Sequence, residues 1–366
     1  MPVARESTDP SIYTVPPPQP TKRKPGQLST EQLKHFFKEG YVVVPKLFTP
    51  EELQPVIDAI NLQVDELAED LYANKKIKDK HENAGFYERL TLLEKEFPGV
   101  AVLLHKRGIL PKAFQDLWTN ERLLNAVEQI IGPEISGHPV WNLRTKTPKN
   151  AQVTVPWHQD NAYLSSDADD SMTPTAWIPL LDAKRINGCM EVVKGGHRKG
   201  AVATHTCCAG PTWYVMLDEE EMESSLGVSI KEDVVLCEVP FGGVLFINNM
   251  IPHRSLENFS DKIRWSLDLR WLRPDKPNGF YGLKDNILMR TSKDPNFKPD
   301  FESFAKMDRH LLQEKISEEQ AKEDRFSTVV AGPWMSNWEI VHHNKHSDAW
   351  LAIRDKPNGL SSSWHA

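Results

Sequence analysis

The spacing of apolar residues changes character along the chain. Up to about residue 132, apolar positions recur every three or four residues, which is the period of a helix with one buried face. Ser29 and Thr49 precede two such stretches, and their hydroxyl groups can cap the free backbone amides of a first helical turn. The first helix should end at Gly40 and the second near Leu71. The pattern therefore predicts a helical layer over residues 28–132.

From about residue 135 the chain changes to short β-type runs separated by proline, glycine and asparagine. Many short strands at this spacing are typical of an all-β sandwich or barrel. We therefore expect a mainly β protein with flanking helices and a β core over residues 133–275. An isolated early strand is expected at 41–44, and the core strands at 140–145, 153–157, 175–181, 189–193, 234–239, 244–248 and 263–272.

The two ends of the chain differ from this body. Residues 1–27 are rich in proline and charge, which predicts a mobile or loosely attached arm. A further helix is expected over 300–325, and a single domain over 28–340. The last residues, 341–366, should pack back on the body, because large apolar rings rarely stay in water. Four tryptophans occur near this end: Trp334, Trp338, Trp350 and Trp364.

Composition narrows the possible partners of the protein. The 366 residues are 39% hydrophobic and 26% charged, with a net charge of −7, as in an ordinary globular protein. No basic excess indicates a nucleic-acid partner, and no apolar run approaches the length of a membrane span. The first residues lack the apolar core of a secretory signal, so we expect a cytoplasmic protein. The oligomeric state is left open.

The cysteines do not indicate a metal site. None of the four forms a Cys-x-x-Cys pair, so a structural zinc site of that type is not expected. Four cysteines in a chain of this length also do not form a disulfide framework, and we expect reduced, mostly buried thiols. Cys207 and Cys208 are adjacent, which favours a structural role over shared metal binding.

Candidate chemistry begins at the motif His158-Gln159-Asp160. In an extended strand, residues two apart point to the same side, so an imidazole and a carboxylate would lie side by side. Alone, such a pair is usually an ordinary polar pair on a strand. An iron(II) facial triad needs a second histidine and leaves positions open for substrate and oxygen. Among 13 histidines, His253 is the strongest candidate, because it follows the strand-like run 244–248.

A second pattern follows His253. Residues 263–271 alternate strictly, with apolar side chains on one face and Arg264, Ser266, Asp268 and Arg270 on the other. The charged face could meet solvent or line a polar cavity. A cationic cavity beside iron suits a dicarboxylate such as 2-oxoglutarate, whose far carboxylate fits an arginine fork with a hydroxyl beside it. Arg264 and Ser255 fit these two roles.

Together these residues resemble the phytanoyl-CoA dioxygenase family of iron(II)/2-oxoglutarate oxygenases. The resemblance includes the metal motif, Trp177, the run His253-Arg254-Ser255, and Arg264, in that order. The first 25 residues and roughly the last 80 fall outside it. Three longer stretches also share it: 29–48, 175–180 and 187–197.

The resemblance implies a double-stranded β-helix, a jelly-roll or cupin-like core, with helices before and after it. It implies iron ligation by His158, Asp160 and His253, with O2 as a further co-substrate. It places Arg264 and Ser255 on the far carboxylate of 2-oxoglutarate, and adds two contacts along that molecule, Trp177 and Asn142. Relatives that halogenate lack the carboxylate ligand, so Asp160 favours hydroxylation.

The substrate is the least determined part of the prediction. An acyl-CoA, a small polar metabolite and a natural-product intermediate all remain open, because related folds serve many reactions. Candidate substrate contacts are Arg144, Tyr163, Trp213 and Arg198. Trp177 could instead be plain core, and Trp213 part of a packed loop. Two other functions also remain open: a metal-binding sensor without turnover, and a zinc hydrolase, for which no general base can be named.

Overall fold

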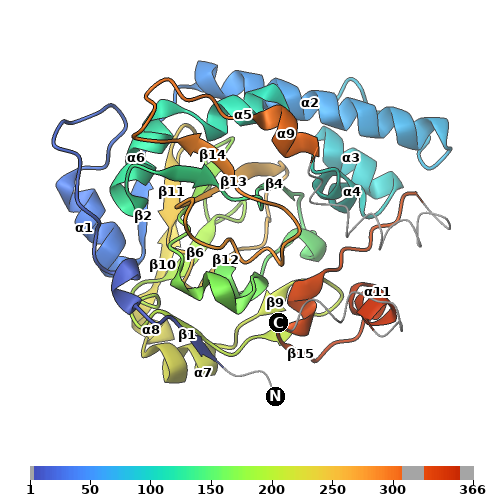
Figure 1. The fold of residues 1–366 in the computed structure, drawn as a ribbon. Helices are drawn as coiled ribbons and strands as arrows, with labels where there is room; N and C mark the ends of the chain where they lie inside the picture. The colour runs from blue at the N-terminus through green and yellow to red at the C-terminus, as the bar shows by residue number, and fades with distance from the viewer. Residues whose placement is uncertain (1–3, 307–324, 355–366) are drawn as a thin grey trace.

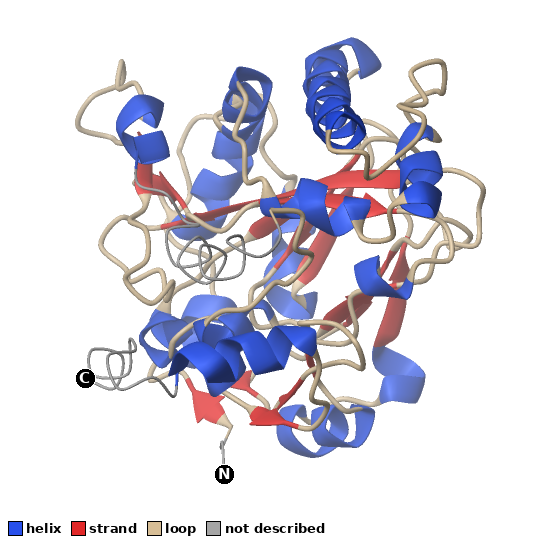
Figure 2. Ribbon diagram, turned by 90° about the vertical axis from the view of Figure 1, so that its right-hand side faces the viewer, coloured by secondary structure: helices blue, strands red, loops and turns tan. Residues whose placement is uncertain are grey.

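A computed structural model describes residues 4–306 and 325–354 of the chain. Two antiparallel sheets form its centre, and helices lie on both sides of them (Figures 1 and 2). None of the helices in these ranges is long and apolar enough to cross a membrane.

The larger sheet has the order β14-β3-β13-β5-β11-β2, and β4 also pairs with β13. Strand β13 pairs with β5, β4 and β3, and all nine of its residues are buried. The strands are β2 (Tyr41–Val44), β3 (Ile135–Gly137), β4 (Asn142–Lys146), β5 (Thr175–Pro179), β11 (Val244–Ile247), β13 (Arg264–Leu272) and β14 (Ile287–Arg290).

The smaller sheet has the order β10-β6-β12, comprising β10 (Val234–Cys237), β6 (Met190–Val193) and β12 (His253–Ser255). One apolar cluster joins Trp177 and Leu245 of the larger sheet to Val192 and Cys237 of the smaller one. The two sheets therefore pack face to face, and burial of these side chains holds them together. Stacked antiparallel sheets of this kind are a jelly-roll core, which confirms the predicted fold class.

Helices before the core cover the larger sheet, as the apolar periodicity predicts. Both predicted caps are confirmed: the side chains of Ser29 and Thr49 accept from the backbone amides of Gln32 and Glu52. Gly40 ends the first helix at φ 89°, a conformation that disfavours a side chain. These helices are α1 (Thr30–Glu39), α2 (Pro50–Ala73), α3 (Arg89–Glu96), α4 (Val100–Lys106), α5 (Lys112–Trp118) and α6 (Glu121–Ile131).

Smaller elements complete the described chain. Strand β1 pairs with β7, and β8 pairs with both β9 and β15. The strands are β1 (Arg5–Glu6), β7 (Ala201–Val202), β8 (Thr206–Cys207), β9 (Val215–Met216) and β15 (Glu339–Ile340). The helices are α7 (Glu219–Glu221), α8 (Ile230–Asp233), α9 (Phe301–Lys306) and α11 (Lys345–Arg354).

The N-terminal segment is not the loosely attached arm that its composition predicts. Within residues 4–27, β1 forms part of a sheet, and Tyr13 is fully buried and donates its hydroxyl to the Asp169 carbonyl at 2.7 Å. Lys24 forms an ion pair of 2.6 Å with Glu128 of α6. Charge is compatible with this packing because Arg5 and Lys24 pair with Asp169 and Glu128 of the body.

The stretch before the metal motif also differs from the prediction. Residues 153–157 are not a strand: a short 3-10 helix occupies Ala151–Val153, and His158 forms a single β-bridge with His253. Pro156 has no amide to donate to a ladder. Asp160 then begins another 3-10 helix, Asp160–Tyr163, so the strand argument for the two ligands was wrong although the residues do meet.

The C-terminal region packs on the body where it is described. Trp338 and Trp350 are buried, while Trp364 lies outside the described residues. The helix expected over 300–325 is seen as α9, and most of that range is likewise outside them.

The expectation of reduced thiols was wrong for two of the four cysteines. Cys207 and Cys208 form a disulfide. Cys189 and Cys237 are free and buried, as predicted.

Candidate metal centre

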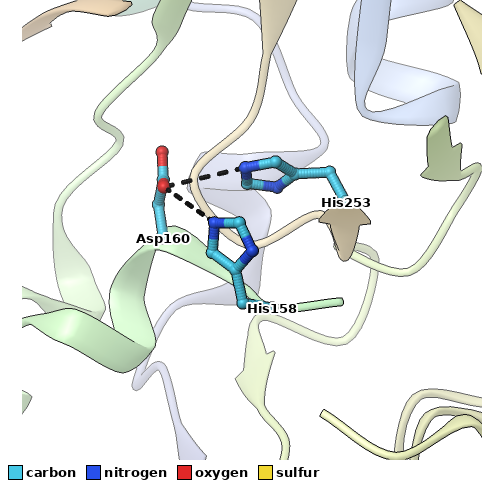
Figure 3. A group of neighbouring side chains, drawn as sticks. All are labelled: His158, Asp160 and His253. Atoms are coloured by element: carbon cyan, nitrogen blue, oxygen red, sulfur yellow. Dashed lines mark ion pairs between the residues drawn. The ribbon is translucent and has the colours of Figure 1, made fainter. Parts of the chain in front are cut away.

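The side chains of His158, Asp160 and His253 point toward one another (Figure 3). His253 opens β12, His158 is bridged to it, and Asp160 follows two residues later at the start of a 3-10 helix. The Nε2 atoms of His158 and His253 lie 3.7 and 3.8 Å from Asp160 Oδ1, and all three side chains are at most 11% exposed. Ligand atoms that each lie about 2 Å from one ion can be up to about 4 Å apart, so these spacings leave room for a metal.

The backbone fixes which imidazole nitrogens face this space. Nδ1 of His158 lies 2.8 Å from the Pro156 carbonyl, and Nδ1 of His253 lies 3.0 Å from the Ile251 carbonyl. A carbonyl only accepts, so each Nδ1 carries the proton and each Nε2 presents a lone pair toward Asp160. Burial lowers the pKa of His253 to about 4, which keeps this ring neutral. The donor set therefore fits a divalent metal ion.

Arg270, on β13, holds the carboxylate ligand in place. Its Nε and one terminal nitrogen donate to the two oxygens of Asp160, each at 3.2 Å, and Thr175 donates to the same group at 3.0 Å. Burial alone would raise the pKa of Asp160, but the Arg270 charge and the two histidines hold it well below its usual value. Sequence reasoning placed Arg270 on the charged face of its strand and gave it no role. The sequence signal for a role of Arg270 was that it lies on the same face of its strand as Arg264.

Replacing Arg270 with glutamine is expected to weaken iron(II) binding by about 10- to 100-fold, because outer partners orient a metal ligand. Equilibrium dialysis of the metal measures this change, and Arg270→Lys should recover part of it. Arg273→Gln is the matched control, since Arg273 follows the same strand but is 49% exposed on its side chain and pairs with Asp275. Unchanged iron affinity in Arg270→Gln would contradict this role.

An inner cavity of about 30 Å³ opens beside the triad, lined by Trp177, Ser255 and Arg264. Arg264 is buried, and its guanidinium donates to Ser266 Oγ at 2.6 Å and lies 5.0 Å from the centre of the Trp177 ring. Its Nε has no hydrogen-bond partner, and no carboxylate of the described residues forms an ion pair with it. Burial lowers the pKa of Arg264 to about 10, so it stays charged at neutral pH. An unpaired buried cation is costly, so this cavity suits an anion.

An outer cavity of about 150 Å³ also borders the metal centre. His158, Arg144 and Arg270 line both cavities, so the two meet at the triad. Of the sequence-predicted residues, Arg144, Tyr163 and Trp213 line the outer cavity. Asn142 also lies there and not in the inner cavity where a 2-oxoglutarate contact was expected. The charged face of β13 thus lines cavities and does not meet solvent.

Arg198 is not brought to either cavity. It lies on a turn, has a side chain 53% exposed, and pairs with Glu39 of α1 at 2.9 Å. Its predicted contact with substrate does not fit this position.

Several lining residues escaped sequence reasoning. Lys106 ends α4, and the segment 330–334 follows the undescribed part of the chain. Trp334 anchors that segment by donating its indole N–H to the Trp213 carbonyl at 3.3 Å. The only sequence signal for the segment 330–334 was the cluster of C-terminal tryptophans. It indicated that this region packs on the body, but not that it lines the outer cavity.

Comparisons with known proteins agree with this geometry. The sequence profile of the phytanoyl-CoA dioxygenase family matches residues 36–266. A phytanoyl-CoA dioxygenase of Arabidopsis thaliana is 24% identical, covering 72% of this chain and 95% of the relative. An ectoine dioxygenase of Nocardia farcinica is 25% identical, covering 71% and 84%.

Among solved structures, EctD from S. alaskensis in its apo form superposes with a TM-score of 0.51 at 18% identity, covering 75% of this chain and 85% of EctD. That likeness supports the jelly-roll fold. Other EctD structures are described with bound iron and with 2-oxoglutarate, the two cofactors predicted here. The profile match confirms the predicted enzyme class, a 2-oxoglutarate-dependent non-haem iron oxygenase. With the profile spanning most of the chain, the protein belongs to the phytanoyl-CoA dioxygenase family.

Proposed function

We propose that this protein is an iron(II)- and 2-oxoglutarate-dependent dioxygenase that hydroxylates a small molecule, with release of succinate and carbon dioxide. One observation carries the proposal: a buried His-Asp-His triad shares a wall with a cavity that ends in an unpaired arginine. A metal alone would not need Arg264. A metal-chelating dicarboxylate would have its far carboxylate directed toward Arg264.

Each residue of the centre has a defined task in this scheme. His158, Asp160 and His253 would hold the iron, and Arg270 would keep Asp160 ionised and oriented. Arg264 would bind the far carboxylate of 2-oxoglutarate, with Ser255 beside it and Trp177 against its chain. When bound, iron supplies the redox chemistry that couples decarboxylation of 2-oxoglutarate with O2 to oxidation of a substrate C–H bond.

The carboxylate ligand favours hydroxylation. Asp160 occupies a position that a halogenating enzyme would leave free for halide, and its bonds to Arg270 and Thr175 hold it there. The names of curated relatives, among them an ectoine dioxygenase and a 1-deoxypentalenic acid 11-beta-hydroxylase, describe oxidations of small molecules.

The outer cavity would give the substrate a largely apolar place beside the triad. Tyr163, Trp213 and Trp334 form aromatic walls, and Tyr163 packs edge-on against the His158 ring at 5.5 Å between centroids. Exclusion of water by such walls strengthens the polar contacts inside and limits side reactions. The substrate would bind in the outer cavity, and 2-oxoglutarate in the inner one.

Reconstitution of the purified chain tests the proposal. Without oxygen, iron(II) plus 2-oxoglutarate should give a weak visible charge-transfer band. After oxygen is added, succinate should form, and a panel of small molecules should identify those that stimulate its release. A band without succinate under every condition would indicate a sensor. Hydrolysis that depends on zinc, with no succinate, would indicate the hydrolase instead.

A further inference from the structure

Lys106 contributes a cation to the outer cavity. It is the last residue of α4, is half-buried, and donates from Nζ to the Ser327 carbonyl at 2.7 Å. No carboxylate of residues 4–306 or 325–354 forms an ion pair with it. Burial first, and then repulsion by Lys345, lower the pKa of Lys106 to about 8. A backbone carbonyl accepts a hydrogen bond from the ammonium group but does not neutralise it.

The groups around Lys106 do not supply the missing negative charge. Lys345 lies on α11 and bonds to Thr328 Oγ1, so it adds a second positive charge. Next to it, His346 accepts from the Val330 amide at 2.9 Å through Nδ1, and burial lowers its pKa to about 4, which leaves it neutral. The potential at this end of the cavity is therefore positive.

The other cations that line the cavity are already paired. Arg144 donates to Asp268 at 2.7 Å, and Arg270 is bound to Asp160. Each of these pairs is fixed by strand β13, so neither arginine is available for a further full charge. Among the described lining residues, Lys106 is the cation that a substrate can neutralise.

The rest of the cavity sets the size and polarity of that substrate. Apart from the triad end, aromatic and aliphatic side chains dominate its wall, including Trp213, Trp334, Val330 and Leu283. A cavity of about 150 Å³ holds a benzene-sized body. A coenzyme A tail would have to lie outside it.

We propose that the outer cavity takes a small, largely apolar acid, whose carboxylate binds Lys106 while its apolar part lies against the aromatic wall beside the triad. This inference rests on the proposed function only in what happens to the acid after it binds. Binding of the acid at Lys106 does not depend on oxygenase activity. The single positive charge of Lys106 matches one carboxylate and does not balance the several negative charges of a polyphosphate.

Binding measurements with matched probes test the proposal. Benzoate, phenylacetate and 3-phenylpropionate are compared with their uncharged amides by calorimetry, on the full chain loaded with iron(II) and 2-oxoglutarate without oxygen, and again without metal. At least one acid should bind about tenfold or more tightly than its amide, as expected for a hydrogen bond between charged groups. In Lys106→Gln this ratio should fall to near one, and Lys106→Arg should retain most of it.

Two further variants control the measurement. Lys34→Gln, an exposed position on α1, should leave the ratio unchanged. Lys345→Gln should reduce it two- to threefold, and gives a reading even if Lys106→Gln does not fold. The proposal is overturned if no acid binds at millimolar concentration, if amides bind as well as acids, or if the preference survives in Lys106→Gln.

Failure of the acid-binding proposal can be distinguished from failure of the proposed oxygenase function. Succinate formation without a Lys106-dependent preference for acids over amides would disprove only the acid-binding site. A Lys106-dependent preference for acids in a protein that never makes succinate would disprove only the proposed oxygenase activity.

Discussion

The Asp160→Ala protein is expected to make no succinate above background, a loss of more than about 100-fold. The carboxylate is the only anionic member of the triad, and its removal should exceed the 10- to 100-fold cost of disturbing a group that merely orients a ligand. Succinate release and iron(II) dialysis measure the effect. Asp261→Ala, in an exposed turn, should behave as wild type.

Loss of Asp160 also leaves Arg270 without its main partner, and its side chain is only 8% exposed. Removing one member of a buried pair costs about 3–5 kcal/mol of folding stability. The double variant Asp160→Ala/Arg270→Ala should therefore regain stability in urea unfolding but still bind no iron. Full turnover in either protein would disprove the metal assignment.

The second large effect is expected at the other end of the inner cavity. Arg264→Gln should raise the 2-oxoglutarate concentration for half-maximal turnover by about 100-fold, since two charge-assisted hydrogen bonds of about 1.5 kcal/mol each are lost. Turnover at saturating 2-oxoglutarate should change much less. Arg264→Lys keeps the charge without the fork and should lie between the two.

A shorter co-substrate makes this test specific. Wild type should use 2-oxoglutarate far better than 2-oxobutyrate, which lacks the far carboxylate, and Arg264→Gln should lose that discrimination. The exposed Arg273 again offers the control, as Arg273→Gln should keep it. Retained discrimination in Arg264→Gln would place the far carboxylate elsewhere.

The helix caps and the charged face of β13 could be predicted because their signals are local or follow a strict period. The triad was predicted from the order of its motifs along the chain and from the family resemblance, since the strand argument for it was wrong. Caps at Ser29 and Thr49 are set by the first turns of their own helices. The alternation from Arg264 to Arg270 follows from the strand period, so the shared face of these side chains was predictable. Whether that face met water or a cavity depended on β4 and the smaller sheet, which no local pattern reveals.

What could not be predicted depends on contacts between distant segments. Arg270 meets Asp160 across 110 residues, and Trp334 meets Trp213 across 121. The composition of residues 4–27 resembles that of an unattached arm, yet Tyr13 is fully buried. Propensity describes a segment by itself, whereas burial depends on the surface that receives it.

Strand β13 carries Arg264, the arginine proposed for 2-oxoglutarate, Arg270, which binds Asp160, and Asp268, which pairs with Arg144, all on one face. A slip of one residue turns every side chain of a strand to its opposite face. Insertion or deletion of a single residue inside 264–270 would point the tryptophans into the cavities and bury the charges in the apolar core. The length of this strand is therefore under tighter constraint than any one of its side chains, and variation in the enzyme should accumulate in the walls around the strand and spare its register.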